Sequence, residues 1–259
     1  MPTVNLIRIH PVKGLPPADV TSARVLPSGA LECDRRWALL DARGRFVNGK
    51  NFPNIHRIGG RFDVSGREVT IDGRTYGLHA QGTAIAAVCG DILGEALTWT
   101  EDAHVGFPDD LDSPGPTLVA AASVAAVAGW FGLEVEAVRR RFRTNIEIDG
   151  VEPFWEDALY GGALGVGAVE VQAINPCARC AVPSRDAATG EATPGFQKRF
   201  AELRRANFAG SASPALFDHY YRFTVNTRIA ASQVGKVIRV GDEVNHPLGP
   251  PSGGPGRAG

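Results

Sequence analysis

The sequence has little cysteine, almost no methionine and almost no net charge. Its 259 residues include four Cys and one Met, and 27 Lys or Arg nearly balance 28 Asp or Glu. Four cysteines in a chain of this length argue against a small disulfide-stabilised scaffold. The balanced charge argues against a dedicated nucleic-acid-binding protein, which usually carries a large basic excess. We therefore expect no nucleic-acid partner.

The sequence also shows neither the pattern of a secretory signal nor that of a clear membrane span. The opening MPTVNLIRIHPVKG has only a short apolar run, which alternates like a strand. Residues 113–133 carry no charge, but this segment begins Ser-Pro-Gly-Pro and is mostly Ala, which contributes little to membrane insertion. A buried amphipathic helix capped by Ser123 is the better interpretation. We expect a cytoplasmic protein with reduced thiols and no membrane contact.

Glycine and proline are abundant, with 31 and 18 residues, and predict a turn-rich fold. Residues 1–80 read as short strands, and Asp72-Gly73 supplies the positive φ angles of a tight hairpin turn. The pattern becomes helical from about 85 to 142. Further strands are expected at 143–150, 163–174 and 223–244, a helix at 196–208, and a disordered tail at 246–259. These elements predict an α+β, β-rich protein.

The sharpest chemical feature is a C-x-x-C motif, Pro176-Cys177-Ala178-Arg179-Cys180, directly after an alternating strand. Three interpretations remain open. A zinc site would need about four ligands, and neither Cys33, Cys89 nor the six His are suitably spaced. A thioredoxin-like redox pair would begin a helix, whereas Pro176 and Pro183 favour a loop. The third is one exposed thiolate that binds a soft metal.

Several polar segments are further candidates. The run Arg139–Asn145 is either a solvated helix end or an anion site, because arginine presents a planar donor fork to oxyanions. His10–Gly14 ends a strand with a lysine and a permissive glycine. Glu156-Asp157 is either an acid/base pair or, more commonly for a polar loop, a solvated or capping pair. Gly165-Val166-Gly167 lacks the third glycine of a dinucleotide-binding fingerprint and reads as a turn.

Taken in order, these segments resemble the MOSC family, whose members bind molybdenum cofactor. The resemblance to the family's N-terminal β-barrel domain rests on residues 10–14, 33–47 and 50–53; that to the MOSC domain rests on 141–150, 156–157, 164–171, 176–180, 186–191, 223–229 and 235–244. The resemblance implies an N-terminal β-barrel-like domain packed on a MOSC β-barrel domain with a few flanking helices. It places the first domain at 1–85, and a helical connection with the MOSC domain at 86–245.

The resemblance also implies a site. Cys180 matches the cysteine that ligates molybdenum, and Cys177 would be a supporting neighbour. Cofactor contacts are implied for Lys13, Lys50, Arg143, Asn145, Arg179 and Cys180. Lys50 stands where many relatives have Arg, which keeps the charge but loses the bidentate fork.

The architecture is similar to that of the mitochondrial amidoxime-reducing component and its bacterial relatives, without their ferredoxin domain. This implies an oxidoreductase that reduces N-hydroxylated or N-oxide substrates by oxygen-atom transfer, with electrons from a separate donor protein. The alternative is a non-catalytic carrier of molybdenum cofactor or sulfur. No zinc or pyridoxal phosphate is implied. Specificity for the small-molecule substrate would lie in loops such as 102–116 and 181–215.

Overall fold

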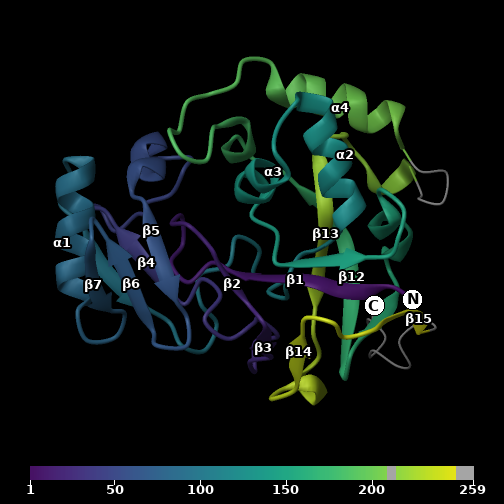
Figure 1. The fold of residues 1–259 in the computed structure, drawn as a ribbon, viewed down its shortest axis with the longest axis horizontal. Coiled ribbons are helices and arrows are strands. Elements are labelled where there is room, and N and C mark those ends of the chain that lie inside the picture. Colours follow the sequence, from purple (N-terminus) through teal and green to yellow (C-terminus); the bar gives the residue numbers. More distant parts are fainter. Residues whose placement is uncertain (209–213, 249–259) are drawn as a thin grey trace, which may run out of the picture.

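The computed structural model describes residues 1–208 and 214–248. Within these ranges the fold is α+β and rich in strands, which confirms the predicted fold class (Figure 1). A group of small sheets with one helix occupies one side of the view, and a large curled sheet with three helices occupies the other.

The large sheet has eight strands and runs through most of the chain. Its spatial order is β15 (Val244–Leu248), β11 (Ala163–Val166), β12 (Val169–Ala178), β13 (Arg222–Arg228), β9 (Leu118–Ala120), β10 (Ile146–Asp149), β1 (Thr3–Ile9) and β2 (Ala18–Val20). All neighbouring pairs are antiparallel except β9 and β10. The register of β12 against β13 shifts between Pro176 and Ala178, so Cys177 lies at an irregularity of the strand. Such irregularities often re-aim side chains beside functional sites.

Two of the smaller sheets build the N-terminal part, and the third joins β3 to a strand near the C-terminus. β4 (Trp37–Leu40) pairs with β8 (Thr98–Glu101), and β5 (Gly60–Asp63), β6 (Glu68–Ile71) and β7 (Arg74–Gly77) form a meander. α1 (Gly82–Leu93) packs against β8 and β7, and β14 (Val237–Arg239) pairs with β3 (Ser22–Arg24). Asp72 and Gly73 both have positive φ, at 49° and 71°, which confirms the predicted hairpin turn.

Three helices lie over the large sheet at the top of Figure 1: α2 (Ala121–Phe131), α3 (Val135–Phe142) and α4 (Phe196–Ala206). Short 3-10 turns connect the elements: η1 (Pro53–Arg57), η2 (Trp155–Leu159), η3 (Val182–Ser184), η4 (Pro214–Leu216) and η5 (Ala231–Gln233). The predicted Ser123 cap is wrong. The residue before the first turn of α2 is Ala120, and Ser123 lies inside the helix, where its hydroxyl donates to Glu156.

The two parts of the chain share segments. β1 is the first strand, yet it pairs with β10 in the middle of the large sheet. α1 runs through residue 85, and β8 beyond it pairs with β4 of the N-terminal part. The division at residue 85 stays a prediction. β15 runs to Leu248, three residues into the segment predicted as a tail, and residues 249–259 lie outside the described ranges.

No single helix among the described residues has the length and apolar character needed to cross a membrane. α2 and α3 reach that length only together, and they are bent by 105° at the break between them. Gly132 lies at this break, with a left-handed φ of 61°, and its backbone N–H closes the end of α2.

Candidate functional site

The loop that follows β1 carries Lys13. Its backbone is fixed, because the Lys13 N–H donates to the Trp37 carbonyl oxygen over 2.8 Å. The next residue, Gly14, has a φ of +89°, and a Cβ there would lie 2.6 Å from Ile55 Cδ1. This combination of left-handed backbone and close packing requires glycine. The turn therefore holds Lys13 in a position where only 8% of the residue is exposed.

The Lys13 ammonium group contacts the loop between β8 and β9. Its Nζ donates to the Phe107 carbonyl oxygen over 2.9 Å and to Asp109 Oδ1 over 2.5 Å. Burial lowers the pKa of Lys13; Asp109 opposes this shift, whereas Arg35 and Arg143 reinforce it. The Asp109 side chain is 79% exposed. A buried cation is thus balanced by a surface carboxylate, which another anion could replace.

Arg35 belongs to the same cluster, and the sequence prediction of the site missed it. Its backbone has a φ of +50°, and its N–H donates to the His10 carbonyl oxygen over 2.7 Å. The Arg35 guanidinium pairs with Asp34, whose Oδ1 also accepts the His10 N–H. Burial opposes the charge on Arg35, but Asp34, Asp109 and the Cys177 thiol raise its pKa. Arg35 therefore links the cationic cluster to the Cys177 side of the C-x-x-C motif.

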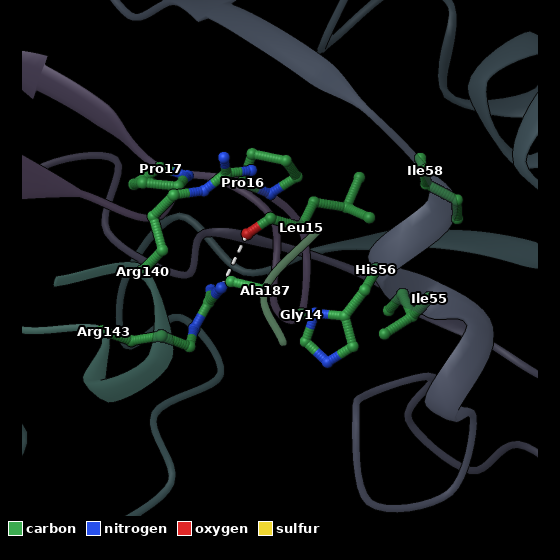
Figure 2. Close-up of a pocket in the computed structure, with 10 residues that line it drawn as sticks. All are labelled: Gly14, Leu15, Pro16, Pro17, Ile55, His56, Ile58, Arg140, Arg143 and Ala187. Atoms are coloured by element: carbon green, nitrogen blue, oxygen red, sulfur yellow. Dashed lines mark hydrogen bonds between the residues drawn. The ribbon is translucent and has the colours of Figure 1, made fainter. Parts of the chain in front are cut away.

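Arg143 approaches the cluster from the end of α3. It ends α3 in a left-handed conformation, with a φ of 53°, which is uncommon for a non-glycine residue. One guanidinium nitrogen, Nη1, donates to the Leu15 carbonyl oxygen over 2.8 Å (Figure 2). The buried Nη2 has no hydrogen-bond partner among the described residues. Burial, reinforced by nearby Arg35, lowers the pKa of Arg143 to about 10. Among the residues that the structure describes, no carboxylate forms an ion pair with this cation.

Asn145 lies close in sequence but has a different environment. Its Nδ2 donates to the Arg8 carbonyl oxygen over 3.0 Å, and its Oδ1 accepts both the N–H and the hydroxyl of Thr117. These bonds tie β10 to β1 and to the residue before β9. The amide is 2% exposed and engaged at both ends, and the predicted cofactor contact stays a prediction.

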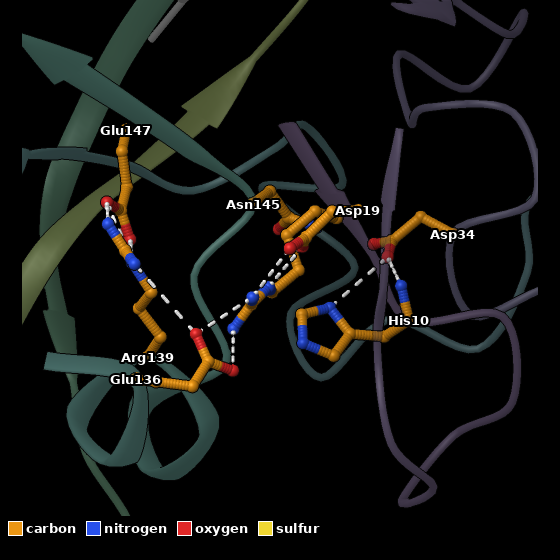
Figure 3. A network of polar contacts seen from close by, with 8 residues as sticks. His10, Asp19, Asp34, Glu136, Arg139, Asn145 and Glu147 are labelled. Atoms are coloured by element: carbon orange, nitrogen blue, oxygen red, sulfur yellow. Dashed lines mark hydrogen bonds and ion pairs between the residues drawn. The ribbon is translucent and has the colours of Figure 1, made fainter. Parts of the chain in front are cut away.

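The other arginines of the 139–143 run separate in the structure. Arg139 pairs with the fully buried Glu147 over 2.8 Å, in the network of Figure 3 that also includes Glu136 and Asp19. Arg141 donates to Thr193 Oγ1 and to a backbone carbonyl. The run is therefore neither a uniformly solvated face nor a single anion site.

The C-x-x-C motif lies where β12 ends. Arg179 donates to the Phe223 and Phe142 carbonyl oxygens and to Thr224 Oγ1, so its guanidinium anchors this turn to neighbouring backbone. Both thiols are half-buried. Cys180 Sγ accepts the Val182 N–H over 3.5 Å. The two sulfurs have different electrostatic neighbours. Negative charge on Cys177 raises the pKa of Arg35, and negative charge on Cys180 raises the pKa of Tyr221.

The predicted residues are thus brought together only in part. Lys13 and Arg143 act on each other electrostatically, as the predicted anion-binding end requires. Lys50 is exposed, and its backbone N–H donates to Asn48 Oδ1. Its predicted role, like those of Cys180 and Arg179, stays a prediction.

Glu156 and Asp157 form a second cluster, and the expectation of a solvated pair is wrong. They are 1% and 2% exposed. Glu156 Oε2 accepts the Ala120 N–H and the Ser123 hydroxyl. Burial, with the neighbouring Asp157 charge, raises the pKa of Glu156 to about 7. Asp157 pairs with the buried Arg204. This cluster lies beneath α2 and α4.

No group of three or more His, Cys, Asp or Glu among the described residues is arranged to hold a metal ion. Cys33 and Cys89 are both buried, and burial raises the pKa of the Cys89 thiol to about 12. The accessible thiols of the described chain are therefore the two of the C-x-x-C motif.

Comparisons with known proteins are consistent with this two-part organisation. Two molybdenum cofactor sulfurases are similar in sequence: that of Caenorhabditis elegans is 30% identical over 129 residues, and that of Caenorhabditis briggsae is 35% identical over 83 residues. These matches cover 45% and 32% of this chain but only 18% and 11% of the relatives. This chain thus matches less than a fifth of each curated relative.

Two solved structures are similar at lower levels. The YuaD protein of Bacillus subtilis matches over 94% of both chains with 9% identity and a TM-score of 0.43. YiiM of Geobacillus stearothermophilus matches over 51% of this chain and 53% of its own, with 14% identity and a TM-score of 0.33. Residues 1–90 match the model of the MOSC N-terminal beta barrel domain, and residues 116–245 match that of the MOSC domain. The chain therefore belongs to the MOSC family.

Proposed function

We propose that this chain binds molybdenum cofactor where its N-terminal part meets the MOSC domain. The observation that carries the proposal is Arg143, a half-buried cation whose buried Nη2 has no partner among the described residues, in a cluster with Lys13 and Arg35. Membership of the MOSC family and similarity to proteins named molybdenum cofactor sulfurase support it.

The residues present fit such a group. The cofactor carries a phosphate at one end and a sulfur-bound metal at the other. The unpartnered Arg143 Nη2 and the Lys13 ammonium, whose counter-ion is at the surface, suit the phosphate. The half-buried Cys180 thiol suits the metal, because soft thiolates are good ligands for soft metals. No carboxylate has to be displaced from Arg143 itself.

Each residue then has a defined task. Lys13 and Arg143 hold the phosphate from two segments that are distant in sequence. Arg35 positions the groups beside Lys13, because it pairs with Asp34 and attracts the Asp109 carboxylate. Asn145 and Arg179, whose donors are bound to protein groups, position β10 and the end of β12. Cys180 provides the thiolate, and Lys50 contributes a cation at the exposed edge.

The bound cofactor would supply the redox chemistry that removes oxygen from N-hydroxylated or N-oxide substrates. We propose that electrons come from a separate donor protein. Within this chain, the 102–116 loop bears Asp109 over Lys13, and it is a candidate to control access of the small-molecule substrate.

The test is to produce the protein with a supply of cofactor and to measure molybdenum per chain and reduction of a hydroxylamine or amidoxime. Cys180→Ala is compared with Cys177→Ala, since both thiols are half-buried and lie in one motif. We expect Cys180→Ala to lose metal and activity and Cys177→Ala to keep both. Equal metal and activity in the wild type and Cys180→Ala would contradict the proposal.

A second candidate function is transfer of sulfur or cofactor without turnover. It is favoured by the two accessible thiols and by the sulfurase names of the sequence relatives. This function predicts that purified protein carries an additional sulfur atom on Cys180, detectable by intact mass and removed by a reductant, with no reductase activity.

A further inference from the structure

A groove lies between α1 and the β6–β7 hairpin, in the N-terminal part of the molecule. Its volume is about 360 Å³, within the size range of small-molecule sites in proteins. Figure 1 shows α1 and β7 at the outer left of the view, away from the large sheet. The groove shares no residue with the cluster of Lys13, Arg35 and Arg143 or with the C-x-x-C motif. Its lining residues are Asp72, Arg74, Tyr76, Val88, Asp91 and Ile92.

The lining comes from two elements that pack together. Arg74 and Tyr76 are two residues apart on β7, so their side chains share one face of the strand. Val88, Asp91 and Ile92 are three and four residues apart on α1, so they share one face of the helix. α1 and β7 contact each other. One strand face and one helix face therefore form the groove.

Half of the lining is apolar or aromatic. Tyr76, Val88 and Ile92 are half-buried, and each packs against the main hydrophobic core of the molecule. Their remaining surface is accessible and lines the groove. The apolar body of a ligand that covered this surface would remove it from water, which is favourable for binding.

The charged lining residues are available to a ligand. Asp72, Arg74 and Asp91 are exposed, and within residues 1–208 and 214–248 their side chains form no hydrogen bond or ion pair. Asp91 lies in the last turn of α1, where the helix has no basic residue. Because the C-terminal end of a helix carries partial negative charge, Asp91 adds to this charge instead of balancing it. The two aspartates therefore favour a cationic group, and Arg74 favours an anionic one.

We propose that this groove binds a free α-amino acid with an apolar side chain. The ammonium group of the ligand pairs with Asp91 and Asp72, its carboxylate pairs with Arg74, and its side chain covers the apolar lining. A simple amine would leave Arg74 without an anion, and a simple carboxylic acid would leave both aspartates without a cation. This site is independent of the proposed binding of molybdenum cofactor.

The first experiment is a calorimetric titration of the full chain with L-phenylalanine. It is compared with 2-phenylethylamine, which lacks the carboxylate, and with 3-phenylpropionate, which lacks the ammonium group. Because the three probes share the same apolar body, each comparison isolates one charge of the ligand. We expect saturable binding of L-phenylalanine that is about fivefold tighter than that of either analogue, the effect of one additional ion pair in an open groove.

Substitutions then locate the site. Asp91→Asn and Arg74→Gln are the test variants, and Glu95→Gln and Arg61→Gln are their matched controls, because both control residues are exposed and neither lines the groove. We expect the affinity for L-phenylalanine to fall about fivefold in each test variant and to stay unchanged in each control. All four side chains are at the surface, so each variant should fold.

Absence of saturable L-phenylalanine binding, equal or tighter binding of either analogue, or equal losses in the test and control variants would overturn the proposal. Cys180→Ala keeps L-phenylalanine binding under this proposal, whereas it loses metal under the proposed function. The two proposals can therefore fail separately.

Discussion

Two arginines, one buried and one half-buried, have different surroundings. Arg204, on α4, is 2% exposed, pairs with Asp157 and lies 4.2 Å over the Phe154 ring. Arg143, at the end of α3, donates to one carbonyl oxygen, and both cations (Arg35, Arg8) and carboxylates (Asp109, Asp34) act on it without direct contact. Loss of hydration is costly for both arginines, but of the two only Arg204 forms an ion pair among the described residues.

The difference separates a structural charge from a charge available to a ligand. The Arg204 pair joins α4 to η2, and aromatic side chains enclose it. Arg143 instead borders a pocket and the cationic cluster. A guanidinium whose charge is unbalanced in the protein alone is stabilised when an anion binds. Substitutions in each region can test this contrast.

The largest effect is expected from Arg204→Ala. It would leave Asp157 buried and unpaired, and a broken buried ion pair costs about 3–5 kcal/mol of the free energy of unfolding. Arg205→Ala on the same helix is the control, because that residue is exposed and should cost under about 1 kcal/mol. Urea unfolding measures both. Similar losses of stability in the two variants would contradict a structural role for the Arg204–Asp157 pair.

The next effect concerns Glu156, whose pKa of about 7 in the folded chain lies above its ordinary 4.5. The folded state therefore binds the Glu156 proton more tightly than the unfolded state does. The contribution of Glu156 to stability is greatest below pH 4.5 and falls as the pH rises toward 7. Glu156→Gln removes this fall, so the pH slopes of the two proteins should differ by up to about 3 kcal/mol between pH 4.5 and 8.

The exposed Glu152→Gln serves as the control for that pH series. Urea midpoints measured from pH 4.5 to 8 should give the same slope for this variant as for the wild type. If Glu156→Gln and the wild type show the same change of stability with pH, Glu156 is charged in the folded chain and the prediction is wrong.

The smallest change in stability is expected from Arg143→Met, which replaces a charge that has no ion pair among the described residues with an apolar chain of similar length. The free energy of unfolding should change by less than about 1 kcal/mol, or increase. Arg139→Met is the comparison, because Arg139 lies on the same helix but forms an ion pair. This variant should lose more stability, because the buried Glu147 carboxylate would be left without its arginine partner. Thermal unfolding compares them, and a larger loss in Arg143→Met would contradict the contrast.

Sequence alone predicted the features that local chemistry decides. Asp72-Gly73 forms its turn because the required φ angles belong to those two residues. The helix at 196–208 is present as α4, Phe196–Ala206. The strand predicted at 163–174 is present as two strands, β11 and β12. β12 buries alternate residues up to Ala173 and continues through Cys177 to Ala178, where a loop was predicted.

Features that depend on distant partners were not predictable in the same way. Ser123 has a capping side chain, but the fold extends α2 past it and gives its hydroxyl to Glu156, 33 residues away. Glu156 and Asp157 look solvated in their loop, and only the packing of α2 and α4 buries them. Arg35 lay within the family-like segment 33–47, yet its role depends on Asp109 and Cys177.

The position of β1 has a consequence for how the protein is made. Ile7 pairs with Ile146, and Arg8 exchanges hydrogen bonds with Asn145 across 137 residues. Lys13 follows the first partner strand, and Arg143 precedes the second. A nascent chain must therefore expose β10 before these two cations can meet, and sequence-distant pairing of this kind is slow. Ligand-binding competence should emerge late in synthesis, after the N-terminal meander has had time to form.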